Sequence, residues 1–192
     1  AGRAAAAQHS QNLNAVIAHF PGSKIVIPSD AYTAKGLLKS AIRDNNPVIV
    51  VEHRKHYSVE FDMPDDGMKI SCFPSAIRCV HEGSDVTVVA NSFQVGQCVK
   101  VAKHLEKKKG VSVEVVDLRT LVPLDKETII KSVKKTGRLL IVDEGYTSFA
   151  WPPRSVPRFR MSVLRSGCAI QRCVRLTCPS PSAPPWKTRG AQ

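Results

Sequence analysis

The stretch Lys24–Glu52, KIVIPSDAYTAKGLLKSAIRDNNPVIVVE, decides the fold of this chain. Its first residues, Lys24–Pro28, form a short β-branched run, and residues 31–43 repeat apolar side chains at the spacing of a helix. Residues 47–52 then form a second apolar run of strand length. The pattern predicts a β-α-β unit, in which a helix joins two parallel strands.

The same alternation of strand and helix continues downstream. Strands are predicted at residues 85–90, 111–117 and 138–143, and helices at 94–109 and 126–135. Ser29 or Asp30 can cap the first helix, since a short side-chain oxygen accepts from free amides of the first turn. Gly110 and Gly137 follow the two later helices, as glycine often does. An α/β fold with a mostly parallel, doubly wound sheet is therefore expected.

The region between these two parts has a different composition. It is polar and rich in turn residues, and Pro64, Asp65, Asp66 and Gly67 stand together in it. We expect an exposed linker at residues 58–84, between a first domain at 1–57 and a second at 85–150.

Residues 151–192 differ from the rest of the chain. They contain seven Arg, one Lys and no acidic residue, and so carry +8 of the formal charge of +12. They also hold seven of the 13 prolines and show no sustained period. A disordered basic tail is expected, either as a native segment for an acidic partner or as a translation out of its frame. Nucleic-acid binding is not expected, because the tail lacks the interleaved aromatic residues that stack on bases.

Other whole-chain features exclude several classes of protein. The six cysteines include no C-x-x-C pair, which favours free thiols in a reducing compartment over a zinc site or a disulfide scaffold. No apolar run reaches the roughly 18 to 20 residues of a membrane-spanning helix, so no membrane partner is expected. The first residue is Ala1, and no targeting segment is visible near it.

Several stretches together resemble one known family. They are His9-Ser10-Gln11 followed by AHFPGSKIVIPSDAYTAKGLLKSAIRDNNPVIVVEH, then EGSDVTVVA, then VSVEVVDLRTLVPLDKETIIKSVKKTGRLLIVDEGYTSFAW. In order and spacing they resemble the beta subunit of the decarboxylating first component of 2-oxo acid dehydrogenase complexes, of the pyruvate or acetoin type. That family belongs to the transketolase-like thiamine enzymes. The resemblance implies the later part of a pyrimidine-binding domain at 1–57 and a truncated transketolase C-terminal-like domain at 85–150.

The resemblance also implies a function, a cofactor and partners. With an alpha subunit, in a heterotetramer, such a chain decarboxylates a 2-oxo acid through thiamine diphosphate and passes the acyl group to lipoyl groups of an acyltransferase core. The alpha subunit holds the diphosphate and its magnesium. The compartment would be the bacterial cytoplasm or the mitochondrial matrix. In the family, the earlier part of the first domain supplies the glutamate that activates the cofactor, so the alternative is an inactive fragment that serves only in assembly.

His9 is the candidate catalytic residue. It matches the active-site histidine of the family's His-Ser-Gln motif. An imidazole titrates near neutral pH, so it can donate or accept a proton while the acyl group moves to the lipoyl arm. Judged without the resemblance, a histidine near a chain end is a solvated surface residue.

Ala41, Asp44 and Asn46 are the candidate metal ligands. They match positions at which some family members hold a potassium ion through oxygen atoms. A helix C-terminus presents unpaired carbonyl groups with partial negative charge, which suits a hard cation. The alternative is an ordinary helix stop before Pro47.

Two further clusters follow predicted strands. His53, Arg54, Lys55 and His56 form a basic run, interpreted as solvated, with a role at a subunit interface as the alternative. Asp143 and Glu144 end the last predicted strand. Adjacent residues on a strand point to opposite faces, so we expect a structural role for these two carboxylates rather than an acid/base pair.

Overall fold

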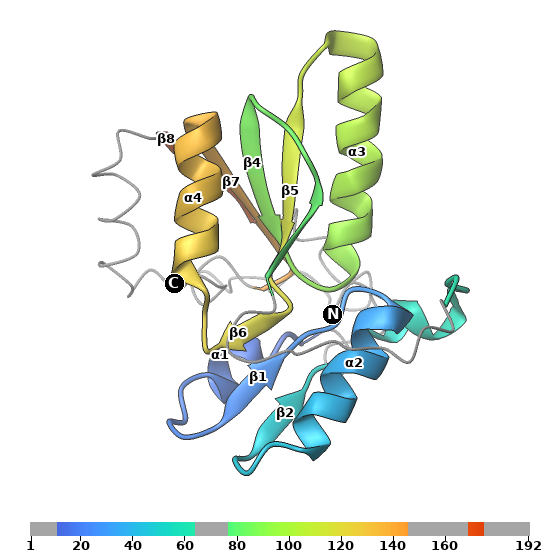
Figure 1. The fold of residues 1–192 in the computed structure, drawn as a ribbon, viewed down its shortest axis with the longest axis vertical. Helices are drawn as coiled ribbons and strands as arrows, with labels where there is room; N and C mark the ends of the chain where they lie inside the picture. The colour runs from blue at the N-terminus through green and yellow to red at the C-terminus, as the bar shows by residue number, and fades with distance from the viewer. Residues whose placement is uncertain (1–10, 64–76, 146–168, 175–192) are drawn as a thin grey trace, which may run out of the picture.

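The computed structural model describes residues 11–63, 77–145 and the backbone of 169–174. In chain order its elements are α1 (Asn14–Ile17), β1 (Lys24–Val26), α2 (Ala31–Ile42), β2 (Val48–Val50), the 3₁₀ helix η1 (Arg54–Ser58), β3 (Arg78–His81), β4 (Val86–Ala90), α3 (Phe93–Lys109), β5 (Val113–Asp117), β6 (Thr120–Val122), α4 (Lys126–Thr136), β7 (Arg138–Asp143) and β8 (Ala169–Val174). The strands form two sheets, of order β2-β1-β6 and β3-β5-β4-β7-β8 (Figure 1). Helices and sheets alternate, so the predicted α/β class is confirmed.

The first sheet contains the predicted β-α-β unit. Strands β1 and β2 are parallel, with Ile25 opposite Ile49, and α2 connects them. Asp30 is the N-cap of α2, since its carboxylate accepts a 2.6 Å hydrogen bond from the Thr33 amide. The Thr33 hydroxyl in turn accepts from the Asp30 amide at 3.1 Å, which completes a capping box. Of the two predicted caps, Asp30 is therefore the one used.

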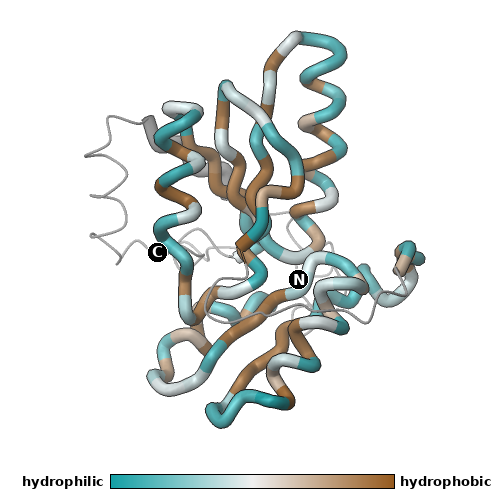
Figure 2. Tube along the Cα trace, in the orientation of Figure 1, coloured by the Kyte–Doolittle hydropathy of each residue, from teal (hydrophilic) through white to brown (hydrophobic). Residues whose placement is uncertain are grey.

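The second sheet is doubly wound, as predicted. Strands β5, β4, β7 and β8 run parallel, and β3 is antiparallel at one edge. Apolar residues alternate between the two faces of the sheet. Val88 and Val115 pack with Ala102 of α3, whereas Val89 and Val116 pack in the cluster that holds Ile129 of α4. Figure 2 shows hydrophobic residues along these central strands.

Strand β6 joins the two sheets and was not predicted. It follows β5 in the chain but pairs antiparallel with β1 of the first sheet. The turn between β5 and β6 places Arg119 at a φ of 52°, and its carbonyl accepts a 2.7 Å hydrogen bond from the Ile27 amide. Ile25 and Ile27 consequently share one buried cluster with residues of the second sheet.

Strand β3 corrects the predicted linker. It lies within residues 58–84, where the sequence predicted an exposed connection, yet Arg78 pairs with Asp117 of β5. Gly83 shows how closely the chain that leaves β3 follows β5, because a Cβ there would collide with the main chain of Val113 and Glu114. This strand was not predicted because it is only four residues long and lies in a polar, turn-rich segment.

Strand β8 differs from the predicted disorder of residues 151–192 over six residues of that segment. Residues Ala169–Val174 (AIQRCV) pair parallel with β7, with Arg138 opposite Ala169 and Asp143 opposite Val174. This short strand pairs with β7, which would otherwise form the edge of the sheet. The rest of the predicted tail lies outside the described residues.

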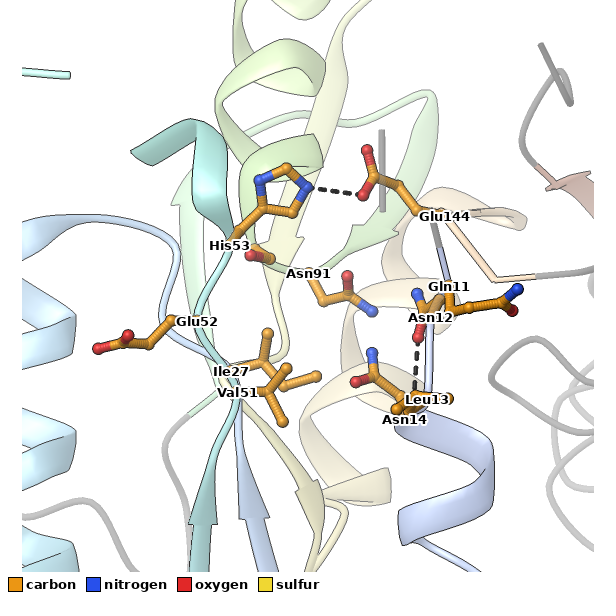
Figure 3. Close-up of a pocket in the computed structure, with 11 residues that line it drawn as sticks. Gln11, Asn12, Leu13, Asn14, Ile27, Val51, Glu52, His53, Asn91 and Glu144 are labelled. Atoms are coloured by element: carbon orange, nitrogen blue, oxygen red, sulfur yellow. Dashed lines mark hydrogen bonds and ion pairs between the residues drawn. The ribbon is translucent and has the colours of Figure 1, made fainter. Parts of the chain in front are cut away.

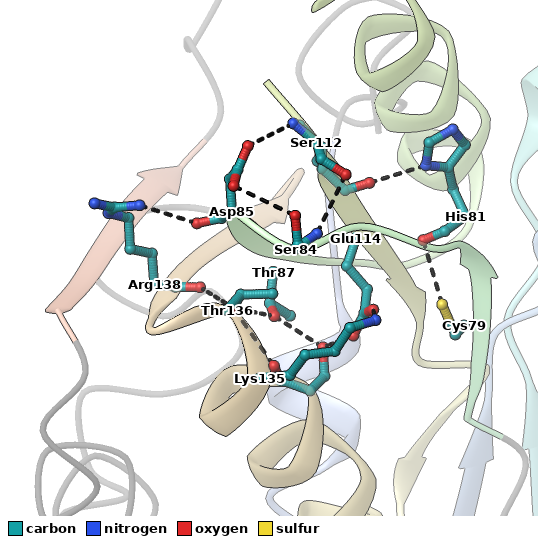
Figure 4. A network of polar contacts seen from close by, with 12 residues as sticks. Cys79, His81, Ser84, Asp85, Thr87, Ser112, Glu114, Lys135, Thr136 and Arg138 are labelled. Atoms are coloured by element: carbon teal, nitrogen blue, oxygen red, sulfur yellow. Dashed lines mark hydrogen bonds and ion pairs between the residues drawn. The ribbon is translucent and has the colours of Figure 1, made fainter. Parts of the chain in front are cut away.

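A buried polar network fixes α4 on the second sheet (Figure 4). The Thr87 hydroxyl lies 2.8 Å from the hydroxyls of both Ser132 and Thr136. Glu114 accepts hydrogen bonds from the Ser132 hydroxyl and the Lys135 ammonium. Burial would raise the pKa of Glu114, but these bonds outweigh it and lower that pKa. Every member has a partner within the network, so we assign it a structural role.

Candidate functional site

A pocket of about 100 Å³ lies between the two sheets (Figure 3). Its walls come from the segment before α1 and from the residues that follow β1, β2, β4 and β7. Carboxyl ends of parallel strands are where α/β proteins most often bind ligands. The lining residues are Gln11, Asn12, Leu13, Asn14, Ile27, Val51, Glu52, His53, Asn91, Ser92 and Glu144.

His53 and Glu144 are joined by a hydrogen bond across this pocket. The His53 Nε2 atom lies 2.8 Å from Glu144 Oε2, and both side chains are buried. The Lys55 amide donates to His53 Nδ1 at 3.2 Å, so Nδ1 carries no proton and Nε2 donates to the carboxylate. Gln94 donates to the second Glu144 oxygen at 2.8 Å. Burial would raise the pKa of Glu144, but the bonds from His53 and Gln94 outweigh it and lower that pKa.

The burial of His53 corrects the interpretation of residues 53–56 as a solvated run. Its ring stacks on Phe93, with centroids 5.2 Å apart, and the Lys55 ammonium lies 4.9 Å from the Phe93 centroid. Burial also lowers the pKa of His56, and the nearby His53 adds to that effect. Arg54 alone of the four is exposed. Periodicity could not reveal this, because the second sheet covers His53 only in the folded chain.

Asn91 and Ser92 lie between β4 and α3 and were not predicted as site residues. The Asn91 side-chain amide donates to Asp143 Oδ1 at 3.3 Å. Ser92 is buried, with a φ of 49° and a ψ of −133°, and its side chain does not cap α3. Its hydroxyl has no hydrogen-bond partner among the described residues. A polar pair directly between a predicted strand and helix was the only signal in the sequence.

Asp143 and Glu144 have separate partners. Asp143 accepts from Asn91, whereas Glu144 accepts from His53 and Gln94. These separate partners agree with the expectation that adjacent carboxylates on a strand end do not act as a pair.

A second polar contact joins the sheets beside the pocket. The Ser29 hydroxyl donates to Asp117 Oδ2 at 2.5 Å, and Arg119 Nε donates to the same oxygen at 3.0 Å. Burial raises the pKa of Asp117, although both donors oppose that rise. The other oxygen, Oδ1, is buried without a partner among the described residues. These side chains meet across 88 positions of sequence, so no local pattern indicated the contact.

The three predicted potassium ligands do come together after α2. The Ala41 carbonyl accepts from the Asp44 amide at 3.2 Å, and Asp44 Oδ1 accepts from the Asn46 amide at 2.8 Å. The Lys24 ammonium binds Asp44 Oδ2 and, with Asn46, lowers the pKa of Asp44 to about 2. Because both carboxylate oxygens are engaged, a cation there would be held by main-chain carbonyl oxygens.

A neighbouring pocket of about 170 Å³ lies on the other side of Glu52 and His53. Small apolar residues of α2 and the side chains of His56, Tyr57 and Phe61 line it. The two pockets therefore share one wall at the end of β2.

His9 lies outside the described residues. Gln11, two positions later, lines the pocket between the sheets. In the sequence, the predicted catalytic residue therefore stands two positions before a residue that lines this pocket.

The described residues contain neither a cluster of metal-binding side chains nor a helix that could span a membrane. Among residues 11–63 and 77–145, no three His, Cys, Asp or Glu side chains come together as a metal site. Within the same ranges, no helix is both long and apolar enough to cross a membrane.

Sequence comparisons identify the class to which this fold belongs. The profile of the transketolase pyrimidine-binding domain matches residues 1–60. The profile of the transketolase C-terminal domain matches residues 75–151. The chain therefore belongs to the transketolase-like family.

Within that family the chain is similar to beta subunits of two enzymes. It is 46% identical over 144 residues to the beta subunit of acetoin:2,6-dichlorophenolindophenol oxidoreductase from Cupriavidus necator, covering 75% of this chain and 42% of the relative. It is 47% identical over 147 residues to the beta subunit of the mitochondrial pyruvate dehydrogenase E1 component from Chaetomium thermophilum, covering 75% of this chain and 38% of the relative. The chain thus spans about two fifths of the length of these relatives.

Two solved structures of other proteins are similar to this chain in fold, at sequence identities too low to indicate function. A split-gene transketolase, described as an inactive beta4 tetramer, matches with a TM-score of 0.64 and 22% identity, over 83% of this chain and 50% of that one. A transketolase from Pichia stipitis matches with a TM-score of 0.52 and 20% identity, over 69% of this chain and 20% of that one.

Proposed function

We propose that the chain acts as part of the beta subunit of a thiamine diphosphate-dependent 2-oxo acid dehydrogenase of the pyruvate or acetoin type. The observation that carries this proposal is the identity of 46–47% to two such beta subunits, over about 75% of this chain. With an alpha subunit, in a heterotetramer, it would decarboxylate a 2-oxo acid and acylate the lipoyl groups of an acyltransferase core.

The described residues can supply only part of a cofactor site. Pockets that enclose a cofactor usually measure roughly 300–1,000 Å³, whereas the pocket between the sheets measures about 100 Å³. Its lining offers amides, a hydroxyl and an imidazole, which suit a neutral ring better than a diphosphate. Thiamine diphosphate, when bound, supplies the carbanion of the reaction. The diphosphate and its magnesium would belong to the alpha subunit.

His9 would transfer a proton at the acyl group in this enzyme. Its position in the chain, two residues from the pocket wall, supports that role. An imidazole can hold or release a proton at neutral pH, which suits a group that must do both within one reaction cycle.

Potassium would stabilise the segment after α2. Main-chain oxygens of Ala41, Asp44 and Asn46 at the end of α2 would hold it, since carbonyl groups there carry partial negative charge. A ligand that binds only the native state raises its stability. The melting temperature of the complex with an alpha subunit should therefore be higher in potassium than in tetramethylammonium. Equal melting temperatures in potassium and in tetramethylammonium would contradict the proposed potassium site.

The first experiment is titration calorimetry of thiamine diphosphate with magnesium. It is made with the chain alone, with the alpha subunit of the Cupriavidus necator acetoin enzyme alone, and with their mixture. We expect the mixture to release more heat than the alpha subunit alone, because the chain completes the pocket.

Two variants test whether His9 has the proposed catalytic role. His9→Ala should leave complex formation intact and abolish acyl transfer from an added 2-oxo acid to an added lipoyl domain, whereas His19→Ala, at an exposed position, should leave both intact. Absence of any stable complex with several alpha subunits of the family would refute the proposed function. A complex that forms without extra heat would leave assembly as the remaining role.

A further inference from the structure

The pocket beside α2, on the far side of Glu52 from the pocket between the sheets, has a mostly apolar lining. Its lining includes the small residues Pro28, Ala31 and Ala34 and the rings of His56, Tyr57 and Phe61. The pocket measures about 170 Å³. A cavity of roughly 150 Å³ accommodates benzene, so a group of about six heavy atoms with an apolar part fits here.

The aromatic rings give this pocket walls that attract positive charge. The rings of His56 and Phe61 lie at 85° to each other, with centroids 5.9 Å apart, and Tyr57 adds a third ring. Burial is the main cause of the lowered pKa of His56, so its ring is uncharged at neutral pH. Faces of uncharged aromatic rings attract cations, because their π electrons concentrate negative charge there.

Two carboxylates in the same lining have only uncharged donors. Asp30 Oδ1 accepts from the Thr33 amide at 2.6 Å, and Glu52 Oε2 accepts from the Tyr57 hydroxyl at 2.7 Å. Among the described residues, no Lys or Arg forms an ion pair with either carboxylate. Figure 3 shows the Glu52 side chain pointing away from the pocket between the sheets. Each carboxylate therefore keeps an oxygen for a further donor.

The positive groups near this pocket do not neutralise the two carboxylates. Arg54 is exposed, and the Lys55 ammonium lies 4.9 Å from the centroid of Phe93; neither residue lines the pocket. Any charge on His53 is matched by Glu144, 2.8 Å away. The N-terminus of α2 carries partial positive charge, but the carboxylate that caps it offsets that charge. The pocket thus favours a cation.

We infer that the pocket beside α2 binds a primary ammonium group on a short aliphatic chain. The chain packs against Ala31 and Ala34 and the aromatic rings, and the ammonium donates to Asp30 and Glu52. Hydrogen bonds between charged partners are stronger than those between neutral ones. An anion would meet like charges instead. This inference is independent of the proposed function, because it uses neither the cofactor nor an alpha subunit.

Butylammonium, 1-butanol and butyrate provide a matched series of probes. They have alkyl chains of similar length, and their polar ends are positive, neutral and negative. Each is titrated at neutral pH into the ¹⁵N-labelled full chain, and the amide shifts of residues 30–34 and 52–61 are followed. Butylammonium should move these signals with a millimolar dissociation constant, since few atoms contribute to binding. 1-Butanol should bind roughly three- to tenfold more weakly, because two partly exposed charge contacts are lost, and butyrate should cause no shifts there.

Two further cations define the ammonium group more closely. Tetramethylammonium has no N–H group to donate to the carboxylates, so it should bind more weakly than butylammonium. Nα-acetyl-lysine amide carries the same four-carbon ammonium chain on a peptide unit. Affinity equal to that of butylammonium would identify a lysine side chain as the ligand, whereas weaker binding would identify a free amine.

Variants that remove one charge each test the role of the carboxylates. Glu52→Gln and Asp30→Asn should each weaken butylammonium binding roughly two- to fivefold. Gln still accepts from Tyr57, and Asn is as good an N-cap as Asp, so both variants should keep the fold. Glu60→Gln, at an exposed position outside the lining, is the matched control and should change nothing. Ala34→Met should fill the pocket and abolish binding, while amide signals elsewhere show a folded chain.

Three results would overturn the inference. The first is a butylammonium titration without shifts at residues 30–34 and 52–61, or with shifts confined to the predicted potassium site at 41–46. The second is equal or tighter binding of 1-butanol or tetramethylammonium. The third is unchanged butylammonium affinity in both Glu52→Gln and Asp30→Asn. None of these results depends on complex formation, so a failure here is distinct from a failure of the proposed function.

Discussion

The Ser29 hydroxyl and the Asp117 carboxylate join the two sheets through a hydrogen bond of 2.5 Å. Asp117 is fully buried and one of its oxygens has no partner among the described residues, so Ser29 and Arg119 are its main compensation. Two nearby parts of the fold, β6 and the His53–Glu144 pair, also connect the sheets.

Removing the Ser29 hydroxyl should destabilise the whole chain. In Ser29→Ala, Asp117 keeps Arg119 as its one side-chain donor among the described residues. Loss of a hydrogen bond to a buried carboxylate costs about 1–3 kcal/mol. Urea unfolding followed by circular dichroism measures this loss. Ser58→Ala, at an exposed position, is the control and should lie within about 0.5 kcal/mol of the original chain. Similar stabilities of the two variants would contradict the importance of the contact.

The His53–Glu144 pair should make stability depend on pH in the acid range. The folded pKa of Glu144 is lowered, so the unfolded chain binds its proton more readily. Its contribution is therefore fully present above the unfolded pKa and is lost as pH falls through the folded pKa. Urea midpoints at successive acid pH values should fall less steeply in Glu144→Gln. Parallel curves for the two chains would show that the pair contributes no pH dependence.

Gly83 and Gly96 should respond to alanine in opposite directions. A Cβ at Gly83 would collide with the backbone of Val113 and Glu114, so Gly83→Ala should cost more than about 2 kcal/mol. Gly96 is exposed within α3, and a Cβ there meets nothing within 4 Å. Gly96→Ala should therefore stabilise the chain by roughly 0.5–1 kcal/mol through helix propensity. The melting temperatures of both variants test these expectations. Equal changes in melting temperature would argue against the close path of the chain along β5.

The pKa of Asp44 should depend on Lys24. That pKa is lowered from 3.8 to about 2, first by the hydrogen bond from Lys24 and next by the amides of Asn46. Lys24→Met should raise it toward 3.8 without restoring it fully, because Asn46 remains. The side-chain carboxyl signal in a ¹³C NMR titration reports this value directly. Lys39→Met, at an exposed position on α2, should leave the pKa unchanged.

Strand β8 should protect its backbone amides from exchange. Its pairing with β7 predicts slowed hydrogen exchange within residues 169–174, measured by mass spectrometry of peptides that cover them. Ile170→Pro removes an amide and is poorly tolerated in a paired strand, so it should abolish that protection. Exchange at the rate of a free peptide in the original chain would mean that this strand does not persist in solution.

Periodicity predicted the elements that are long and locally consistent. The β-α-β unit around α2, the order of elements from β4 to β7 and the cap at Asp30 followed from local patterns. The short strands β3, β6 and β8 were missed because three to six residues carry too little period to stand out from turn-rich surroundings.

The polar contacts between the sheets could not be predicted for a different reason. Glu144 lies 91 positions from His53 in the chain, and Asp117 lies 88 from Ser29. Such pairs depend on how the sheets pack, and no single segment encodes that packing. Resemblance to a family placed His9, Ala41, Asp44 and Asn46, but it could not reveal the conformation of Ser92, which is visible only in the folded backbone.

The position of β6 has a consequence for how the chain can be divided. A polypeptide that stops at residue 60, where the match to the pyrimidine-binding domain ends, would lack the strand that pairs with β1. Its exposed β-edge would be free to pair with other molecules, which favours aggregation. A polypeptide that begins after residue 60 would contain β6 (Thr120–Val122) without β1, the strand with which it pairs. The two evolutionary modules are therefore not separable units of expression, because the first sheet has all three of its strands only when both modules are present.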